Sequence, residues 1–233
     1  MLRNLLISLL LLSFVYIFYN LYVGFTPKTE LDGIAAHYAD KGAAEIGAAN
    51  LVTAVVVTYR GFDTLGEVTI LFLTASIIGF FLKLTEADEN KVIIHRGTSE
   101  LLVTSSNLLV PIIILFGIYV FMNGHLTPGG GFQGGAIIAS AVALAILANP
   151  NMHINHQIIL WVESISGVVF VLIGVLGILL AGGFLDNRVL PQGQFGTLLS
   201  AGAIPIIYSF IGLKVGAEIS NILEKYQKSQ KES

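Results

Sequence analysis

HLTPGGGFQGG, residues 125–135, is the stretch of the chain that most constrains its fold. It places five glycines and a proline between two segments that are each apolar enough to span a bilayer. Irregular backbone at membrane depth is tolerated only inside protein or beside water, because its N–H and C=O groups need partners. The stretch is therefore a candidate site. Since it contains no Asp, Glu, Lys or Arg, we interpret it as a packing element that shapes a cavity.

The composition is that of an integral membrane protein. Hydrophobic residues make up 55% of the 233 residues and charged residues 12%, and the mean hydropathy is +0.81. We therefore expect a multi-pass protein of the cell membrane. The absence of cysteine excludes disulfides, thiol nucleophiles and thiolate metal sites. The net charge of −3, without a basic patch, argues against nucleic acid as a partner.

The apolar segments predict an all-α fold with about seven transmembrane helices. A helix of roughly 20 apolar residues crosses the hydrocarbon core of a bilayer. Segments of this kind lie at about 5–23, 43–59, 64–83, 105–123, 131–148, 157–181 and 195–219. Lysine and arginine accumulate on the cytoplasmic side of a membrane, and their distribution among the connecting segments predicts the N-terminus outside and the C-terminus in the cytoplasm.

The charge distribution also divides the chain. Residues 85–100 form the densest charge run and are predicted to be a cytoplasmic linker. They separate a three-helix unit (1–84) from a four-helix unit (101–223), which is followed by a polar tail (224–233). A charge run of this kind is usually a solvated loop, but its position makes it the natural boundary between the two units.

Ionisable residues within the apolar segments are the first candidates for a functional site, because they are costly in hydrocarbon. Asp63 and Glu67 are four residues apart and so share one face of a helix. One interpretation is structural: Thr64 and Glu67 form a capping box, and Asp63 pairs with Arg60 at a helix start. The other is that Glu67 is a proton or cation relay within the membrane.

Glu163 is the sharper candidate, because it lies inside an apolar segment with no charge partner near it in sequence. It is interpreted either as a protonated side chain that is hydrogen-bonded across a helix interface or as a contact for a cation or water.

Lys214 and Glu218 form an i,i+4 pair near the predicted end of the last helix. There, extension of the lysine toward the cytoplasmic interface is the ordinary explanation.

No motif for catalysis or cofactor binding is present. The sequence contains no phosphate-binding loop, dinucleotide fingerprint or nucleophile triad. His153 and His156 are three residues apart, but no third metal ligand is evident near them. We therefore expect no metal, no cofactor and no catalytic centre in this chain.

Two motifs resemble those of a known family. NLV at 50–52 with RGFDTLGE at 60–67 resembles the last helices of the large A-type protein of Mrp multisubunit Na⁺/H⁺ antiporters, and the equivalent small component of archaeal membrane-bound hydrogenases. FMNGH at 121–125 with PGGGFQGG at 128–135 resembles the signature of the B-type protein of the Mrp antiporters, which has four helices. The motif positions that we carry over as structural are Arg60, Gly61, Asn123, His125, Pro128, Gly129, Gly130, Gly131, Gly134 and Gly135. The chain departs from the commonest arrangement by fusing the two pieces.

The resemblance implies a non-redox subunit of an assembly that moves Na⁺ and H⁺ across a membrane. The assembly is either a standalone antiporter or an Mrp-like module of a membrane-bound hydrogenase or related reductase, whose other subunits and the lipid bilayer are the partners. We expect the chain to line or support an ion path, with Glu67 and Glu163 as the main protonatable groups and Asp63, Lys214 and Glu218 as further candidates. The alternative is a purely structural subunit that docks its neighbours.

Overall fold

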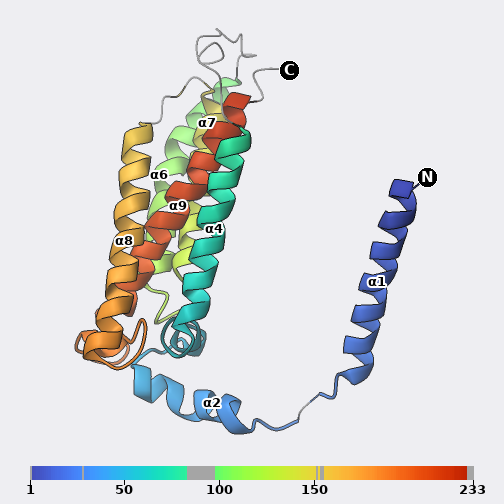
Figure 1. Ribbon diagram of the computed structural model, residues 1–233. Helices are drawn as coiled ribbons and strands as arrows, with labels where there is room; N and C mark the ends of the chain where they lie inside the picture. The colour runs from blue at the N-terminus through green and yellow to red at the C-terminus, as the bar shows by residue number, and fades with distance from the viewer. Residues whose placement is uncertain (1, 28, 83–97, 151, 153–154, 230–233) are drawn as a thin grey trace. The chain divides into compact units, whose positions relative to one another are not determined.

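The computed structural model describes residues 2–27, 29–82, 98–150, 152 and 155–229, and every regular element within these ranges is helical (Figure 1). In chain order the elements are α1 (Leu2–Gly24), α2 (Gly33–Ile46), α3 (Leu51–Thr53), the π-helix η1 (Ala54–Tyr59), α4 (Gly61–Phe81), α6 (Glu100–Met122), α7 (Gly131–Ala148), α8 (His156–Leu180), the 3₁₀-helix η2 (Asn187–Val189) and α9 (Ile204–Ser229).

Six of these helices are long and apolar enough to cross a membrane, and α2 with α3–η1 forms a bent pair that could be a seventh span. The predicted all-α, polytopic fold with about seven membrane helices is therefore confirmed. Residues 85–97 of the predicted linker, His153 and the last four residues of the predicted tail lie outside the described residues.

Residues 1–37 and residues 38–233 form two compact units. The first contains α1 and the start of α2. The side chains of α1 are exposed along its length, as expected of a helix whose apolar surface meets lipid or another subunit. The second unit contains the helical bundle and all the candidate residues.

The predicted continuous span over 43–59 is wrong, because the chain bends by 95° between α2 and α3–η1. Gly47 adopts a positive φ of 75°, which glycine tolerates and other residues rarely do. Asn50 then caps α3, its side-chain oxygen accepting a hydrogen bond from the N–H of Val52. The carbonyl of Ile46 at the end of α2 accepts a hydrogen bond of 2.7 Å from the side chain of Asn187.

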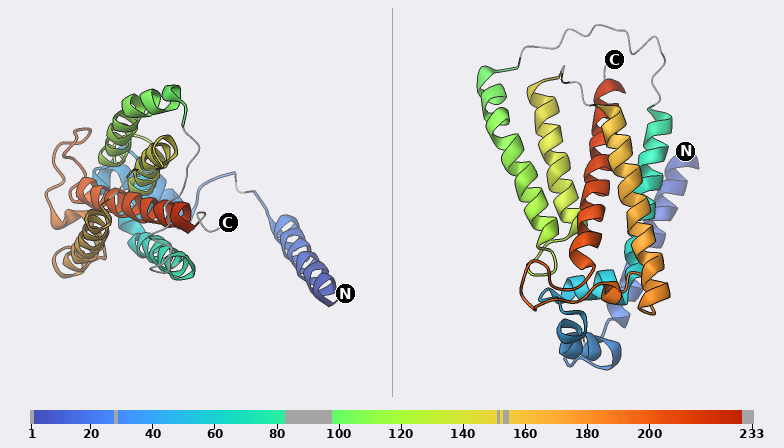
Figure 2. Two further views of the ribbon diagram at one scale, coloured as in Figure 1. Left: turned by 90° about the horizontal axis from the view of Figure 1, so that it is seen from above. Right: turned by 90° about the vertical axis from the view of Figure 1, so that its left-hand side faces the viewer.

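Helix α9 is the centre of the bundle, in contact with α4, α6, α7 and α8 (Figure 2). In the most apolar 18-residue stretch of α9, 61% of the residues are buried, against 11–44% in the corresponding stretches of α4, α6, α7 and α8. The predicted last span over 195–219 and the predicted tail from 224 are wrong here, because α9 runs from Ile204 to Ser229. The reason is that its second half buries polar side chains, namely Glu218, Asn221 and Glu224, which lower the hydropathy that sequence reasoning relies on.

The glycines at the start of α7 bring this helix close to two neighbours. A Cβ atom on Gly134 would lie 2.6 Å from the carbonyl oxygen of Gly117 in α6. A Cβ atom on Gly135 would lie 2.7 Å from the carbonyl oxygen of Gly212 in α9. Helix α7 therefore fits between α6 and α9 only because these positions carry no side chain.

This contact predicts a matched pair of stability changes. Gly135→Ala forces α7 away from α9, so we expect the free energy of unfolding to fall by about 1–3 kcal/mol. Gly66→Ala is the control, because its new Cβ atom has no heavy atom within 4 Å and alanine favours the helix by up to about 1 kcal/mol. Thermal unfolding of the detergent-solubilised protein measures both. Equal losses, or no loss at Gly135, would contradict the packing argument.

Candidate functional site

The segment that joins α6 to α7, residues 123–130, is held by hydrogen bonds from the region of Asn50. The Asn50 side chain donates to the carbonyl oxygens of Gly124 (2.8 Å) and Thr127 (3.0 Å), and its backbone N–H donates to that of His125 (2.9 Å). Thr53 donates to the Gly124 carbonyl at 2.6 Å. The two sequence motifs therefore meet in space, far apart as they are in the chain.

His125 lies in this segment and is fully buried. Its Nε2 atom lies 3.2 Å from the carbonyl oxygen of Thr197. Burial lowers the pKa of His125 below its usual value, against hydrogen bonds to backbone groups that raise it. The imidazole is therefore neutral at neutral pH, and its Nε2–H can donate to the Thr197 carbonyl.

The predicted hairpin at Arg60 lies at the same end of the bundle. Arg60 and Asp63 form the expected ion pair (2.6 Å), but both side chains are at least half exposed. The predicted capping box is wrong: α4 begins at Gly61, and Thr64 instead donates to the carbonyl of Val56 at 2.8 Å. Glu67 is exposed on α4, in the first half of a predicted membrane span.

Lys214 and Glu218 form a buried ion pair near the middle of the 26-residue helix α9. The Nζ–Oε1 distance is 2.6 Å, and the exposed fractions of the two side chains are 8% and 0%. The ammonium group also lies 5.1 Å from the ring centroid of Phe72 in α4, a cation–π distance. The expectation that Lys214 extends to the interface is therefore wrong, because α9 continues for several turns beyond it.

Glu163 of α8 faces the same region. It lines a hollow of 460 Å³ together with Phe72 of α4, Ser164 and Gly167 of α8, and Lys214 of α9. Gly167 lies beside the lysine, since a Cβ atom there would be in van der Waals contact, 3.6 Å, with the Lys214 side chain. The structure thus brings together two predicted candidates, Glu163 and Lys214, that no sequence spacing relates, whereas Asp63 and Glu67 are exposed on α4 near its start.

Polar groups continue from this pair toward the carboxyl end of α9. Asn221 and Glu224 are buried and follow Glu218 at helical spacing. Glu224 lies 4.0 Å from the Nδ1 atom of His156 at the start of α8. Sequence reasoning missed both residues, although the spacing 218, 221, 224 is the signal of a single polar helix face.

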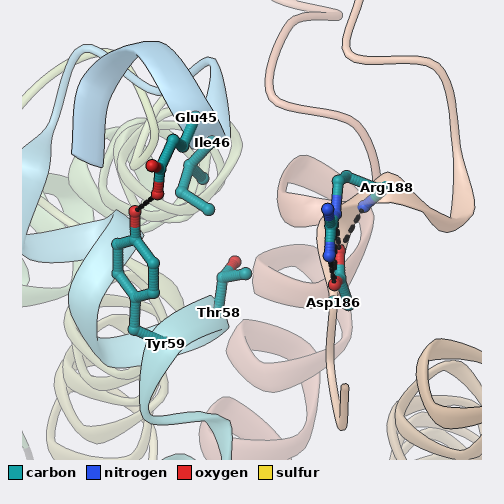
Figure 3. A pocket seen from close by; sticks show the side chains of 6 residues that line it. All are labelled: Glu45, Ile46, Thr58, Tyr59, Asp186 and Arg188. Atoms are coloured by element: carbon teal, nitrogen blue, oxygen red, sulfur yellow. Dashed lines mark hydrogen bonds and ion pairs between the residues drawn. The ribbon is translucent and has the colours of Figure 1, made fainter. Parts of the chain in front are cut away.

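A second polar pocket lies at the opposite end, beside the bend between α2 and η1 (Figure 3). Its volume is 540 Å³, and Glu45, Tyr59, Thr58, Asp186 and Arg188 line it. Tyr59 donates a hydrogen bond to Glu45. Burial raises the pKa of Asp186, but hydrogen bonds and the charge of Arg188 outweigh this and hold it below its usual value. Sequence reasoning missed the Asp186–Arg188 pair, which lies between two apolar segments.

Within the described part of the chain, no three His, Asp or Glu side chains are grouped so that they could hold a metal ion. The chemistry that these sites offer is proton or cation exchange at carboxylates, supported by one buried lysine.

Comparison with known proteins identifies relatives for both halves of the chain. Residues 101–221 match the model of a domain related to the MnhB subunit of Na⁺/H⁺ antiporters, and residues 8–91 match that of MbhE, a subunit of MBH. The B-type Na⁺/H⁺ antiporter subunit of Bacillus subtilis is 38% identical over 88 residues, which are 37% of this chain and 56% of that protein.

Two solved structures share the fold. A chain of the membrane-bound sulfane sulfur reductase, an archaeal respiratory membrane complex, is 36% identical with a TM-score of 0.81, and the match covers 97% of this chain and 98% of that one. A chain of the Mrp complex from Dietzia sp. DQ12-45-1b is 24% identical with a TM-score of 0.73, and the match covers 96% of this chain and 26% of that one.

The burial of His125 predicts how stability depends on pH. Because its pKa is lower in the folded state, the unfolded chain binds a proton more readily, and stability is lost as the pH falls below the unfolded pKa of about 6.5. His125→Gln keeps a donor for the Thr197 carbonyl but does not titrate. We expect the variant to lose less stability than the parent when thermal unfolding is compared at pH about 7.5 and about 5.5. Identical losses would show that His125 does not carry this dependence.

Proposed function

Because the chain belongs to the family of domains related to the MnhB subunit of Na⁺/H⁺ antiporters, and is a multi-pass membrane subunit of an antiporter-like module, we propose that it lines a proton or cation path in its complex. The observation that carries the proposal is the Lys214–Glu218 pair, buried near the middle of α9 beside the hollow that Glu163 lines. Ionisable groups at such depth are retained for function far more often than for packing.

The role that we propose is neither catalytic nor redox. Glu163 takes up and releases a proton or contacts a cation, and the Lys214 ammonium stabilises the ionised carboxylates beside it. The glycine contacts of α7 and the hydrogen bonds around Asn50 support the path by fixing α9, which carries Lys214 and Glu218, against α6 and α7. In this proposal the C-terminus, and with it the polar end of α9, faces the cytoplasm.

We further infer that the complex is of the reductase type rather than a standalone antiporter. The support is that the match to the chain of the sulfane sulfur reductase complex is nearly complete in both proteins. The match to the chain of the Mrp complex covers as much of this chain, 96%, but only 26% of that one. A structural role alone, as a docking platform for neighbouring subunits, is the second candidate, favoured by the exposed position of Glu67 and Asp63.

Neutral substitution of Glu163 tests the path. We expect a complex with Glu163→Gln to assemble normally and to lose ion-coupled transport about tenfold or more, because an amide neither takes up a proton nor balances a cation. Glu67→Gln tests, in the same assay, whether the exposed carboxylate of Glu67 contributes to the path. Glu100→Gln is the matched control, since Glu100 is an exposed carboxylate in the first turn of α6 and should leave transport unchanged.

Lys214 is not suited to this first test, because its removal leaves Glu218 buried without its charge partner, at a cost of about 3–5 kcal/mol.

Transport is measured as Na⁺-dependent proton movement in inverted membrane vesicles, with subunit content checked by gel. Normal transport in both Glu163→Gln and Glu67→Gln would leave the structural role as the better description.

The composition of the purified complex tests its type. We expect the chain, isolated from membranes in mild detergent, to bring with it subunits that carry redox centres, detected by visible absorption and by mass spectrometry. Recovery of only other membrane subunits, without redox centres, would identify a standalone antiporter instead.

A further inference from the structure

The hollow beside Glu163 opens on the outer surface of the bundle, where α9 is seen between α8 and α4 (Figure 1). We call it the Glu163 hollow and define it by Phe72, Glu163, Ser164, Gly167 and Lys214. The three helices that form it are all membrane spans. Glu163 is partly exposed in it and Ser164 is exposed. Polar side chains are thus open to the surroundings of the protein within the apolar part of these helices.

Lipid acyl chains are energetically unfavourable occupants of this hollow. Hydrocarbon cannot bond to a carboxyl or a hydroxyl group, and each such group left without a partner costs free energy. Yet the residues around these polar groups, Val168, Val171 and Leu172, are apolar, which excludes a wide aqueous opening as the natural surroundings. An apolar rim around a polar floor fits a helix that carries one polar side chain on an otherwise apolar face.

The charges specify that side chain. Lys214 and Glu218 neutralise each other through their direct ion pair. Glu163 therefore adds one uncompensated negative charge when it is ionised. A protein side chain that completes the site must therefore donate a proton or carry positive charge.

We propose that a membrane helix of a partner subunit occupies the Glu163 hollow and places a lysine, arginine or histidine side chain beside Glu163. The inference rests on the proposed function only in that the chain works within a complex. It adds that the protonatable site is shared between two subunits and is incomplete in this chain alone.

Site-specific photocrosslinking in the assembled complex tests the proposal. A benzophenone amino acid at Ser164 probes the hollow, and the same group at Ile165 is the control. Ile165 is the next residue of α8, lies at the same depth and is exposed, but the residues that line the hollow do not include it. We expect the probe at Ser164 to form a protein adduct in several-fold higher yield. Mass spectrometry should identify it as an apolar helix with a basic residue within about two turns of the attachment point.

Four results would overturn the proposal: an adduct with lipid only, an adduct with residues 1–37 of the same chain, an adduct with a helix that has no basic residue, or equal yields at Ser164 and Ile165. If the bulky probe prevents assembly, Ser164→Cys is the substitute. The chain has no other cysteine, so disulfides to cysteines placed along the membrane helices of co-purified subunits report the same contact.

The outcome is independent of the transport test. Loss of transport in Glu163→Gln without a partner adduct would retain the path and remove the shared site. A partner adduct with normal transport in Glu163→Gln would retain the interface and remove the path. Where Glu163→Gln loses transport and the partner adduct also forms, a charge reversal tests the pairing. Glu163→Lys should abolish the adduct at Ser164, and replacement of the identified basic residue by glutamate should restore it.

Discussion

In hydrocarbon, backbone N–H and C=O groups must find their partners within protein, and this constraint explains the hydrogen bonds that join distant segments of the second unit. The irregular segment between α6 and α7 is satisfied by Asn50 and Thr53, which donate to its carbonyl groups. Tyr208 of the central helix in turn donates to the Thr53 hydroxyl at 3.0 Å. The bend before α3, the glycine-rich segment and the first half of α9 therefore depend on one another, and a change in any of them leaves buried groups of the others unpaired.

The same constraint makes the two sequence motifs parts of one structure. Asn50 belongs to the N-terminal motif and Gly124 to the C-terminal one, and the Asn50 side chain donates hydrogen bonds to the carbonyls of Gly124 and of Thr127, which lies between the two parts of that motif. Gly61 of the hairpin packs so closely on the carbonyl of Phe184 that a Cβ atom would lie 2.8 Å from it. The two motifs of this chain therefore supply hydrogen-bond partners and packing surfaces to each other.

Sequence reasoning found what depends on length and hydropathy and missed what depends on distant contacts. The spans were predictable because a bilayer requires long apolar runs. The bend at Gly47 was not predictable. The carbonyl of Ile46 at this bend accepts its hydrogen bond from the side chain of Asn187, which is 141 residues away in the sequence. The last span was placed about ten residues too early in the sequence, because Glu218, Asn221 and Glu224 are buried within the protein although they lower the hydropathy of the second half of α9. Glu163 was recognised as a residue without a local partner, but only the fold shows that it shares a hollow with Lys214.

The two halves of α9 differ in a way that bears on any path through this chain. From Ile204 to Ile211 the buried side chains are mainly apolar, with Ile204, Ile207 and Ile211 at most 1% exposed. From Lys214 to Glu224 the buried residues include five polar ones, Lys214, Glu218, Ser220, Asn221 and Glu224, beside the apolar Val215 and Ala217. Glu224 in turn lies near His156. In the path that we propose, the polar side chains of the second half of α9 lie between its carboxyl end and Lys214, and the apolar first half separates Lys214 from the pocket at Glu45 and Asp186. A path confined to this chain would end at the middle of the membrane. Its continuation must leave sideways, and the Glu163 hollow is where a polar group faces outward at that depth.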